Sequence, residues 1–119
     1  MQKLFLLITS ICLYQFSFAQ SINADSAKYF EVKVITVCGK VAGTHVSSGE
    51  KKTTILNIDK SYPQTEFTVV IFADDLPNFK FKPDIYYDKK SICVTGVVKI
   101  YKDKPEIVVT EPSQIKIEN

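Results

Sequence analysis

The sequence has 119 residues, of which 45% are hydrophobic and 24% are charged, a composition typical of globular proteins rather than disordered or fibrous ones. The formal net charge is only +2, and all 15 basic residues are lysine. This balance excludes a strongly basic nucleic-acid-coating protein and an acidic solvating chain. The length accommodates one domain with a small core.

Residues 1–19 have the features of an export signal. Lys3 precedes an apolar stretch at 4–18, and small side chains at Ser17 and Ala19 occupy the positions that a signal peptidase reads. The stretch is shorter than the roughly 20 residues of a membrane-spanning helix, which favours a cleaved signal over a membrane anchor. We therefore expect an exported protein, either periplasmic or secreted.

Removal of the signal, which contains Cys12, leaves two cysteines, Cys38 and Cys93. An even number in an oxidising compartment indicates one disulfide. A zinc site would need about four nitrogen or sulfur ligands, and His45 is the sole histidine of the sequence. We expect neither a metal site nor a cofactor.

After residue 29 the sequence changes from polar residues to residues that favour β-strands. Residues 20–29 are polar and without a period, which predicts a flexible lead. The segments 30–46, 52–59 and 66–73 are rich in valine, isoleucine and threonine and are predicted to form three strands. Two glycines inside the first segment predict a bend or bulge. Two prolines exclude a long helix from the connector at 74–88.

Two further strands are predicted at 90–101 and 105–117, joined by a compact hairpin loop at 102–104. Alternation of side chains places Cys38 on the more polar face of the first strand and Cys93 on the more polar face of the fourth. If these two strands are antiparallel neighbours, the cysteines can meet across the ladder and form the disulfide.

Three strands, an irregular connector between the third and fourth, and a closing hairpin make up the order of an all-β, five-stranded OB-fold Greek-key barrel. The segments VCGKV at 37–41, VTG at 94–96 and KPEI at 104–107 are similar to those of small exported bacterial OB-fold domains, which resemble nucleic-acid-binding OB-folds of the tRNA-anticodon-binding type. The resemblance covers residues 31–117 and implies a barrel over 30–117. The cysteine pair and the proline-broken connector depart from that pattern.

The sequence contains no recognised catalytic set. His45 has no cysteine or serine nucleophile at a known spacing, and the Asp74-Asp75 pair is more typical of a helix cap than of a metal site. A glycine-rich phosphate loop is also missing. We therefore expect a binding module and not an enzyme.

An OB-fold binds ligands on the face of its second and third strands, between the loops that follow strands one and four. Single-stranded nucleic acid requires positive charge and aromatic rings on such a face. The candidate ligand-binding residues in these parts of the chain are Lys51, Lys52, Tyr62, Phe72, Lys99, Tyr101, Lys102 and Lys104. The low net charge, the lack of arginine and the expected export weigh against nucleic acid. Recognition of a protein, peptide or glycan in the cell envelope is therefore the alternative.

Overall fold

The structure, a computed structural model, describes residues 21–118. The predicted export signal lies outside these residues. Among the described residues, no helix has the length and apolar character needed to span a membrane. The elements are β1 (Ser21–Asn23), the 3-10 helix η2 (Ala24–Phe30), β2 (Val34–Val46), β3 (Thr54–Ile58), β4 (Phe67–Ile71), the 3-10 helix η3 (Ala73–Asn78), α2 (Pro83–Tyr86), β5 (Ser91–Tyr101), β6 (Lys104–Val108), the 3-10 helix η4 (Pro112–Gln114) and β7 (Ile115–Ile117).

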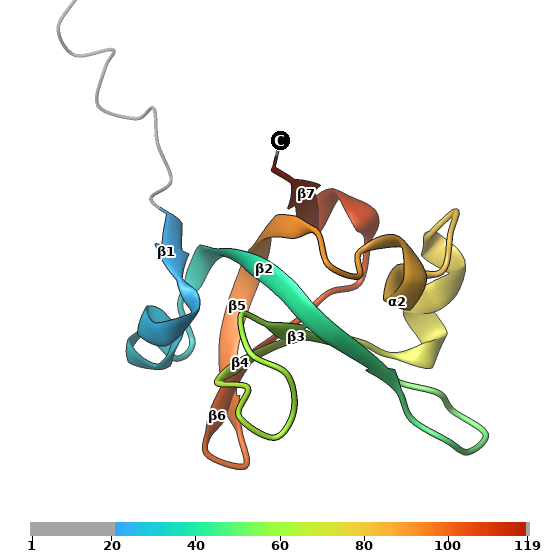
Figure 1. Cartoon of the computed structure of the whole chain (residues 1–119), viewed down its shortest axis with the longest axis horizontal. Coiled ribbons are helices and arrows are strands. Elements are labelled where there is room, and N and C mark those ends of the chain that lie inside the picture. The colour runs from blue at the N-terminus through green and yellow to red at the C-terminus, as the bar shows by residue number, and fades with distance from the viewer. Residues whose placement is uncertain (1–20, 119) are drawn as a thin grey trace, which may run out of the picture.

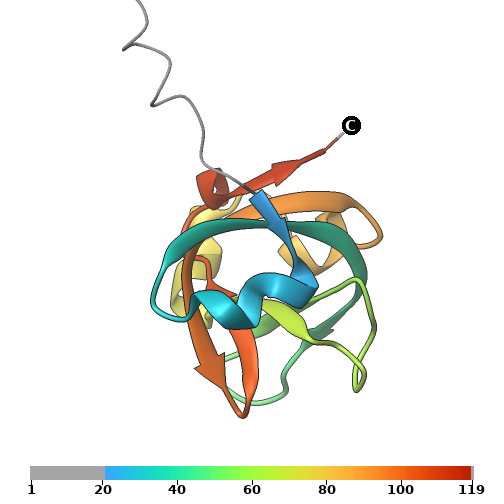
Figure 2. The same cartoon turned by 90° about the vertical axis from the view of Figure 1, so that its left-hand side faces the viewer.

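Five strands pair in a closed ring (Figures 1 and 2). The antiparallel pairs β2–β3, β3–β4, β5–β6 and β2–β5 are completed by the parallel pair β4–β6. Strand β2 closes the ring because its 13 residues pair with β5 in the first half and with β3 in the second half. The register shifts between Val41 and Gly43, so the predicted bulge is confirmed, and it lets one strand serve two neighbours.

The sheet has seven strands, so the expected number of five is wrong. The two additional strands, β1 and β7, are three residues each and pair with β2 and β5 respectively. Strand β7 is separate because the segment predicted as one strand, 105–117, is interrupted by η4, which begins at Pro112. Proline has no N–H to donate to a ladder, so the strand ends before it and resumes after one helical turn.

Residues 21–30 form β1 and η2, although the polar sequence predicts a flexible lead. Helix η2 lies across one end of the ring (Figure 2) and buries Ala24 and Ala27 in the core. The side chain of Asn23 caps it by accepting a hydrogen bond from the N–H of Ser26 at 3.2 Å. Ile22 and Phe30 are partly buried against the same core, and these few apolar residues give the sequence no hydrophobic period.

Alternate residues of the strands fill the inside of the ring. The largest fully buried side chains are Phe67, Leu56, Ile58, Ile71, Ile92, Ile107, Val37, Val41, Val69, Val94, Val98 and Val109. The connector between β4 and β5 contributes Phe79 and Tyr87 to the core, and both side chains are buried. Inside the ring, a Cβ on Gly96 would lie 2.6 Å from Cγ2 of Ile107, so glycine is required there for β5 and β6 to pack closely.

Cys38 and Cys93 are direct register partners of β2 and β5. Their sulfur atoms are bonded, and their Cα atoms lie 4.0 Å apart across 55 residues of sequence. The predicted antiparallel pairing and the predicted disulfide are both confirmed. The bond links the two strands whose pairing closes the ring.

Replacement of both cysteines, as Cys38→Ala with Cys93→Ala, should lower the free energy of unfolding. A cross-link that encloses about 55 residues stabilises the folded chain by about 4 kcal/mol through the unfolded-state entropy. Urea unfolding measures the free energy of unfolding of the oxidised protein, the reduced protein and the double variant. Reduction and substitution should lower it by the same amount relative to the oxidised protein. Equal stability of all three, or two reactive thiols in the native protein, would contradict the cross-link.

Candidate ligand-binding groove

A groove of about 1130 Å³ lies over the outward face of β3, β4 and β6. Its floor is formed by side chains that point away from the ring interior, which are Ile55, Asn57, Thr68, Val70 and Glu106. The second half of β2, the segment 61–65 and the turn between β5 and β6 form its sides. This is the face on which an OB-fold binds its ligands.

Three aromatic side chains from separate parts of the chain line this groove. Tyr62 is 81% exposed, Tyr101 is 59% exposed and Phe72 is 47% exposed. Tyr62 belongs to the segment between β3 and β4, Phe72 follows β4 directly, and Tyr101 ends β5. Exposed aromatic rings carry a large apolar surface that a planar or apolar ligand can cover. The groove therefore offers up to three stacking surfaces.

The turn between β5 and β6 contains two residues, one fewer than the predicted loop at 102–104. Lys102 and Asp103 have φ angles of 50° and 67°, the left-handed pair of a type I′ hairpin turn. Lys104 already belongs to β6. The tight turn holds Lys102 beside Tyr101, with Nζ 5.4 Å from the ring centroid, within range of a cation–π contact.

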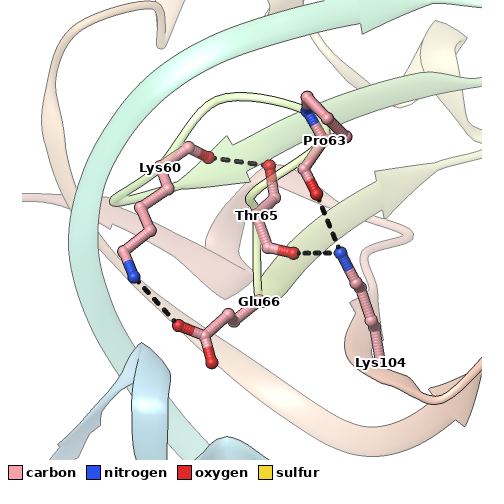
Figure 3. A network of polar contacts seen from close by, with 5 residues as sticks. All are labelled: Lys60, Pro63, Thr65, Glu66 and Lys104. Carbon is pink, nitrogen blue, oxygen red and sulfur yellow. Dashed lines mark hydrogen bonds and ion pairs between the residues drawn. The ribbon is translucent and has the colours of Figure 1, made fainter.

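Lys104 takes part in the polar network drawn in Figure 3, and this network includes residues on both sides of Tyr62, which lines the groove. Its Nζ donates hydrogen bonds to the carbonyl oxygens of Pro63, at 3.1 Å, and Thr65, at 2.7 Å. In the same network Oγ1 of Thr65 donates to the carbonyl oxygen of Lys60 at 2.7 Å, and the ammonium group of Lys60 lies 3.1 Å from the carboxylate of Glu66. Lys104 thus positions this segment through two backbone acceptors.

The structure brings together five of the eight candidate residues and separates the other three. Tyr62, Phe72, Tyr101, Lys102 and Lys104 all line the groove. Lys51 and Lys52 are exposed on the loop between β2 and β3, which extends from the body of the molecule (Figure 1). Lys99 is exposed on β5, as the register partner of Glu106. Positive charge therefore lies at the edges of the groove and beyond, and not on its floor.

Sequence reasoning missed the polar residues of the floor. Asn57, Thr68 and Glu106 interrupt runs of apolar residues at outward positions of β3, β4 and β6. Partial burial raises the pKa of Glu106, and the nearby charge of Lys99 acts in the opposite direction with a smaller effect. One polar residue at an outward position of each of the three neighbouring strands is the signal that could have identified this floor.

Within the described part of the chain, one cluster of potential metal-ligating side chains occurs, formed by Cys38, Cys93 and Glu118. Its two sulfur atoms are bonded to each other, so they are not available as metal ligands. The groove itself contains one carboxylate and one imidazole, those of Glu106 and His45. Besides these two groups, the groove offers aromatic rings and hydrogen-bonding side chains.

No protein-family model and no curated protein sequence matches this chain. Solved structures share its fold. A chain from a crystal structure of yeast Stn1 and Ten1 superposes with a TM-score of 0.57 at 15% identity, over 89% of this chain and 66% of that chain. A putative aspartyl-tRNA synthetase from Leishmania major gives a TM-score of 0.50 at 10% identity, over 87% of this chain and 21% of that chain. The likeness supports an OB-fold-like architecture, as the resemblance implied.

Replacement of Lys104 by methionine should loosen the side of the groove that carries Tyr62. The variant loses two charge-assisted hydrogen bonds to backbone carbonyls, and we expect a loss of about 1 kcal/mol in the free energy of unfolding. Amide hydrogen exchange should accelerate across residues 60–66. Lys102→Met is the matched control, because it removes an adjacent exposed lysine of the hairpin turn. Equal exchange in both variants would contradict the positioning role of Lys104.

Replacement of Glu106 by glutamine should stabilise the protein at neutral pH. Because burial raises the pKa of Glu106 above its ordinary value of 4.5, the folded state binds the proton more tightly than the unfolded state. The ionised carboxylate of Glu106 therefore lowers the free energy of unfolding at a pH above its pKa in the folded protein. Below its ordinary pKa of 4.5 the carboxyl is protonated in both states, and this cost disappears. Thermal unfolding at pH 7 and pH 3 should show a gain for the variant only at pH 7. Glu31→Gln, a substitution of an exposed glutamate, is the control. A Glu106→Gln protein that is less stable than the unmodified protein at pH 7 would contradict the predicted stabilisation.

Proposed function

We propose that this protein is a non-enzymatic binding module that holds a single-stranded nucleic acid in the groove over β3, β4 and β6. The observation that carries the proposal is the convergence of Tyr62, Phe72 and Tyr101 on one groove. Successive unpaired bases stack on such rings, whatever their sequence. The fold likeness adds support, because one of the similar structures is named as an enzyme of tRNA.

The distribution of charge fits bases that face inward and phosphates that face outward. Lys102 lies at the edge of the groove, so a phosphate at that part of the rim would meet an ammonium group. Lys51 and Lys52 lie beyond the groove, on the loop between β2 and β3, where only a longer strand could reach them. The carboxylate of Glu106 on the floor would repel a phosphate placed there. With few cations in reach, binding should depend only modestly on salt concentration.

We further propose that the protein acts in an oxidising compartment outside the cytoplasm. The disulfide between Cys38 and Cys93 is compatible with such a location. The natural ligand would then be an extracytoplasmic nucleic acid. An envelope oligosaccharide is the second candidate, because OB-folds also bind oligosaccharides and the floor offers amide, hydroxyl and carboxylate groups to sugar hydroxyls.

Removal of single aromatic rings should weaken binding of a short oligonucleotide. Stacking contributes about 1–3 kcal/mol per base, so Tyr62→Ala, Phe72→Ala and Tyr101→Ala should each raise Kd by about 5- to 150-fold. Fluorescence anisotropy of a labelled mixed-sequence oligonucleotide, titrated at low and moderate salt, measures the effect.

Tyr29→Ala is the matched control, because Tyr29 is 75% exposed on η2 and does not line the groove. Its Kd should equal that of the unmodified protein. If no oligonucleotide binds at low salt while an oligosaccharide does, the nucleic-acid proposal is wrong and the second candidate replaces it.

A further inference from the structure

Three polar side chains form one row across the floor of the groove. Asn57 on β3 is the register partner of Thr68 on β4, and Thr68 is the register partner of Glu106 on β6. Neighbouring strands are about 4.8 Å apart, and all three residues line the groove. An amide, a hydroxyl and a carboxylate therefore follow one another at the spacing of adjacent strands.

Two members of this row have hydrogen-bonding capacity that the fold does not use. Asn57 is only 6% exposed, yet among the described residues its side chain forms no hydrogen bond. The partly buried carboxylate of Glu106 forms no ion pair within the described part of the chain. Among the described residues no fully buried side-chain nitrogen or oxygen lacks a partner, so the unpaired polar atoms of both groups reach the groove, where a ligand can form hydrogen bonds with them.

The edges of the four bases differ in how they match this row. Guanine presents two adjacent donors, N1–H and the N2 amino group, beside the acceptor O6. A carboxylate accepts from both donors in a bidentate, charge-assisted arrangement, and an amide or hydroxyl donates to O6. Adenine and cytosine present a ring nitrogen acceptor at the central position, and thymine flanks its single donor with two carbonyl oxygens. Each of these three edges places at least one acceptor against the carboxylate.

We propose that the row Asn57–Thr68–Glu106 is a subsite that selects guanine within the bound single strand. Glu106 accepts from N1–H and the N2 amino group, while the amide of Asn57 or the hydroxyl of Thr68 donates to O6. The inference rests on the proposed function and adds base selectivity to it. Stacking on the aromatic rings supplies affinity for any base, and the floor selects among bases.

The test uses labelled oligodeoxythymidylates of about ten nucleotides, the size range of an OB-fold site, with one central base varied. Guanine should bind about 5- to 150-fold more tightly than adenine, cytosine or thymine, the range of a good bidentate pair. Hypoxanthine, which lacks the N2 amino group, should lie between guanine and adenine. Glu106→Gln should abolish most of the guanine preference, which is measured as the ratio of the Kd values of the guanine-containing and all-thymine strands for the same variant.

Glu31→Gln, which removes an exposed carboxylate outside the groove, should retain the preference. Thermal unfolding of each variant confirms that it is folded. Equal affinity for all central bases, with binding still sensitive to Tyr62→Ala, would overturn the guanine subsite and leave the proposed function intact. A preference for cytosine would also overturn it. Lack of binding to every strand would overturn both proposals.

Discussion

The pairing of β2 with β5 is the interaction on which the rest of the structure depends. It joins the first long strand to the last hairpin and thereby closes a ring that local pairings alone would leave open. A ring of paired strands has no exposed edge at this seam, and its interior excludes water from Val37 and Val94, which are register partners. The disulfide lies in the same ladder, so a covalent bond reinforces the strand pairing that has the greatest sequence separation.

Closure of the ring also determines which side chains line the groove. Each strand contributes alternate side chains to the interior, so its remaining side chains must face outward. On β3, β4 and β6 these outward residues would form a plain surface without the chain segments that rise on either side. The segment 60–65 rises on one side because Lys104 binds two of its carbonyl oxygens. The two-residue turn at Lys102 and Asp103 forms another part of the side of the groove, and it holds Tyr101 at the rim.

The floor and the rim of this groove carry different kinds of side chain. The rim carries exposed rings and lysines, whose interactions are tolerant of ligand identity because apolar area and charge are not strongly directional. The floor carries Asn57 and Glu106 in a partly dehydrated setting, where a mismatched hydrogen bond costs more than in water. The partly buried carboxylate is disfavoured for folding, as the raised pKa of Glu106 reflects. The guanine subsite proposed above would give this destabilising carboxylate a role in binding.

The sequence by itself determined the β-rich class, the parity of the core residues, the bulge in the first long strand and the facing cysteines, because alternation along one strand is a local property. It also named the three aromatic residues of the groove. Only the tertiary structure decided that Lys104 is held by backbone carbonyls, that Lys51 and Lys52 lie apart from the groove lining, and that Asn57, Thr68 and Glu106 share one row. It likewise ordered residues 21–30 and divided the final strand at Pro112. The physical reason is the same in each case. Closure of the ring fixes the register between strands and the contacts between distant segments, and a short stretch of neighbouring residues does not contain that information.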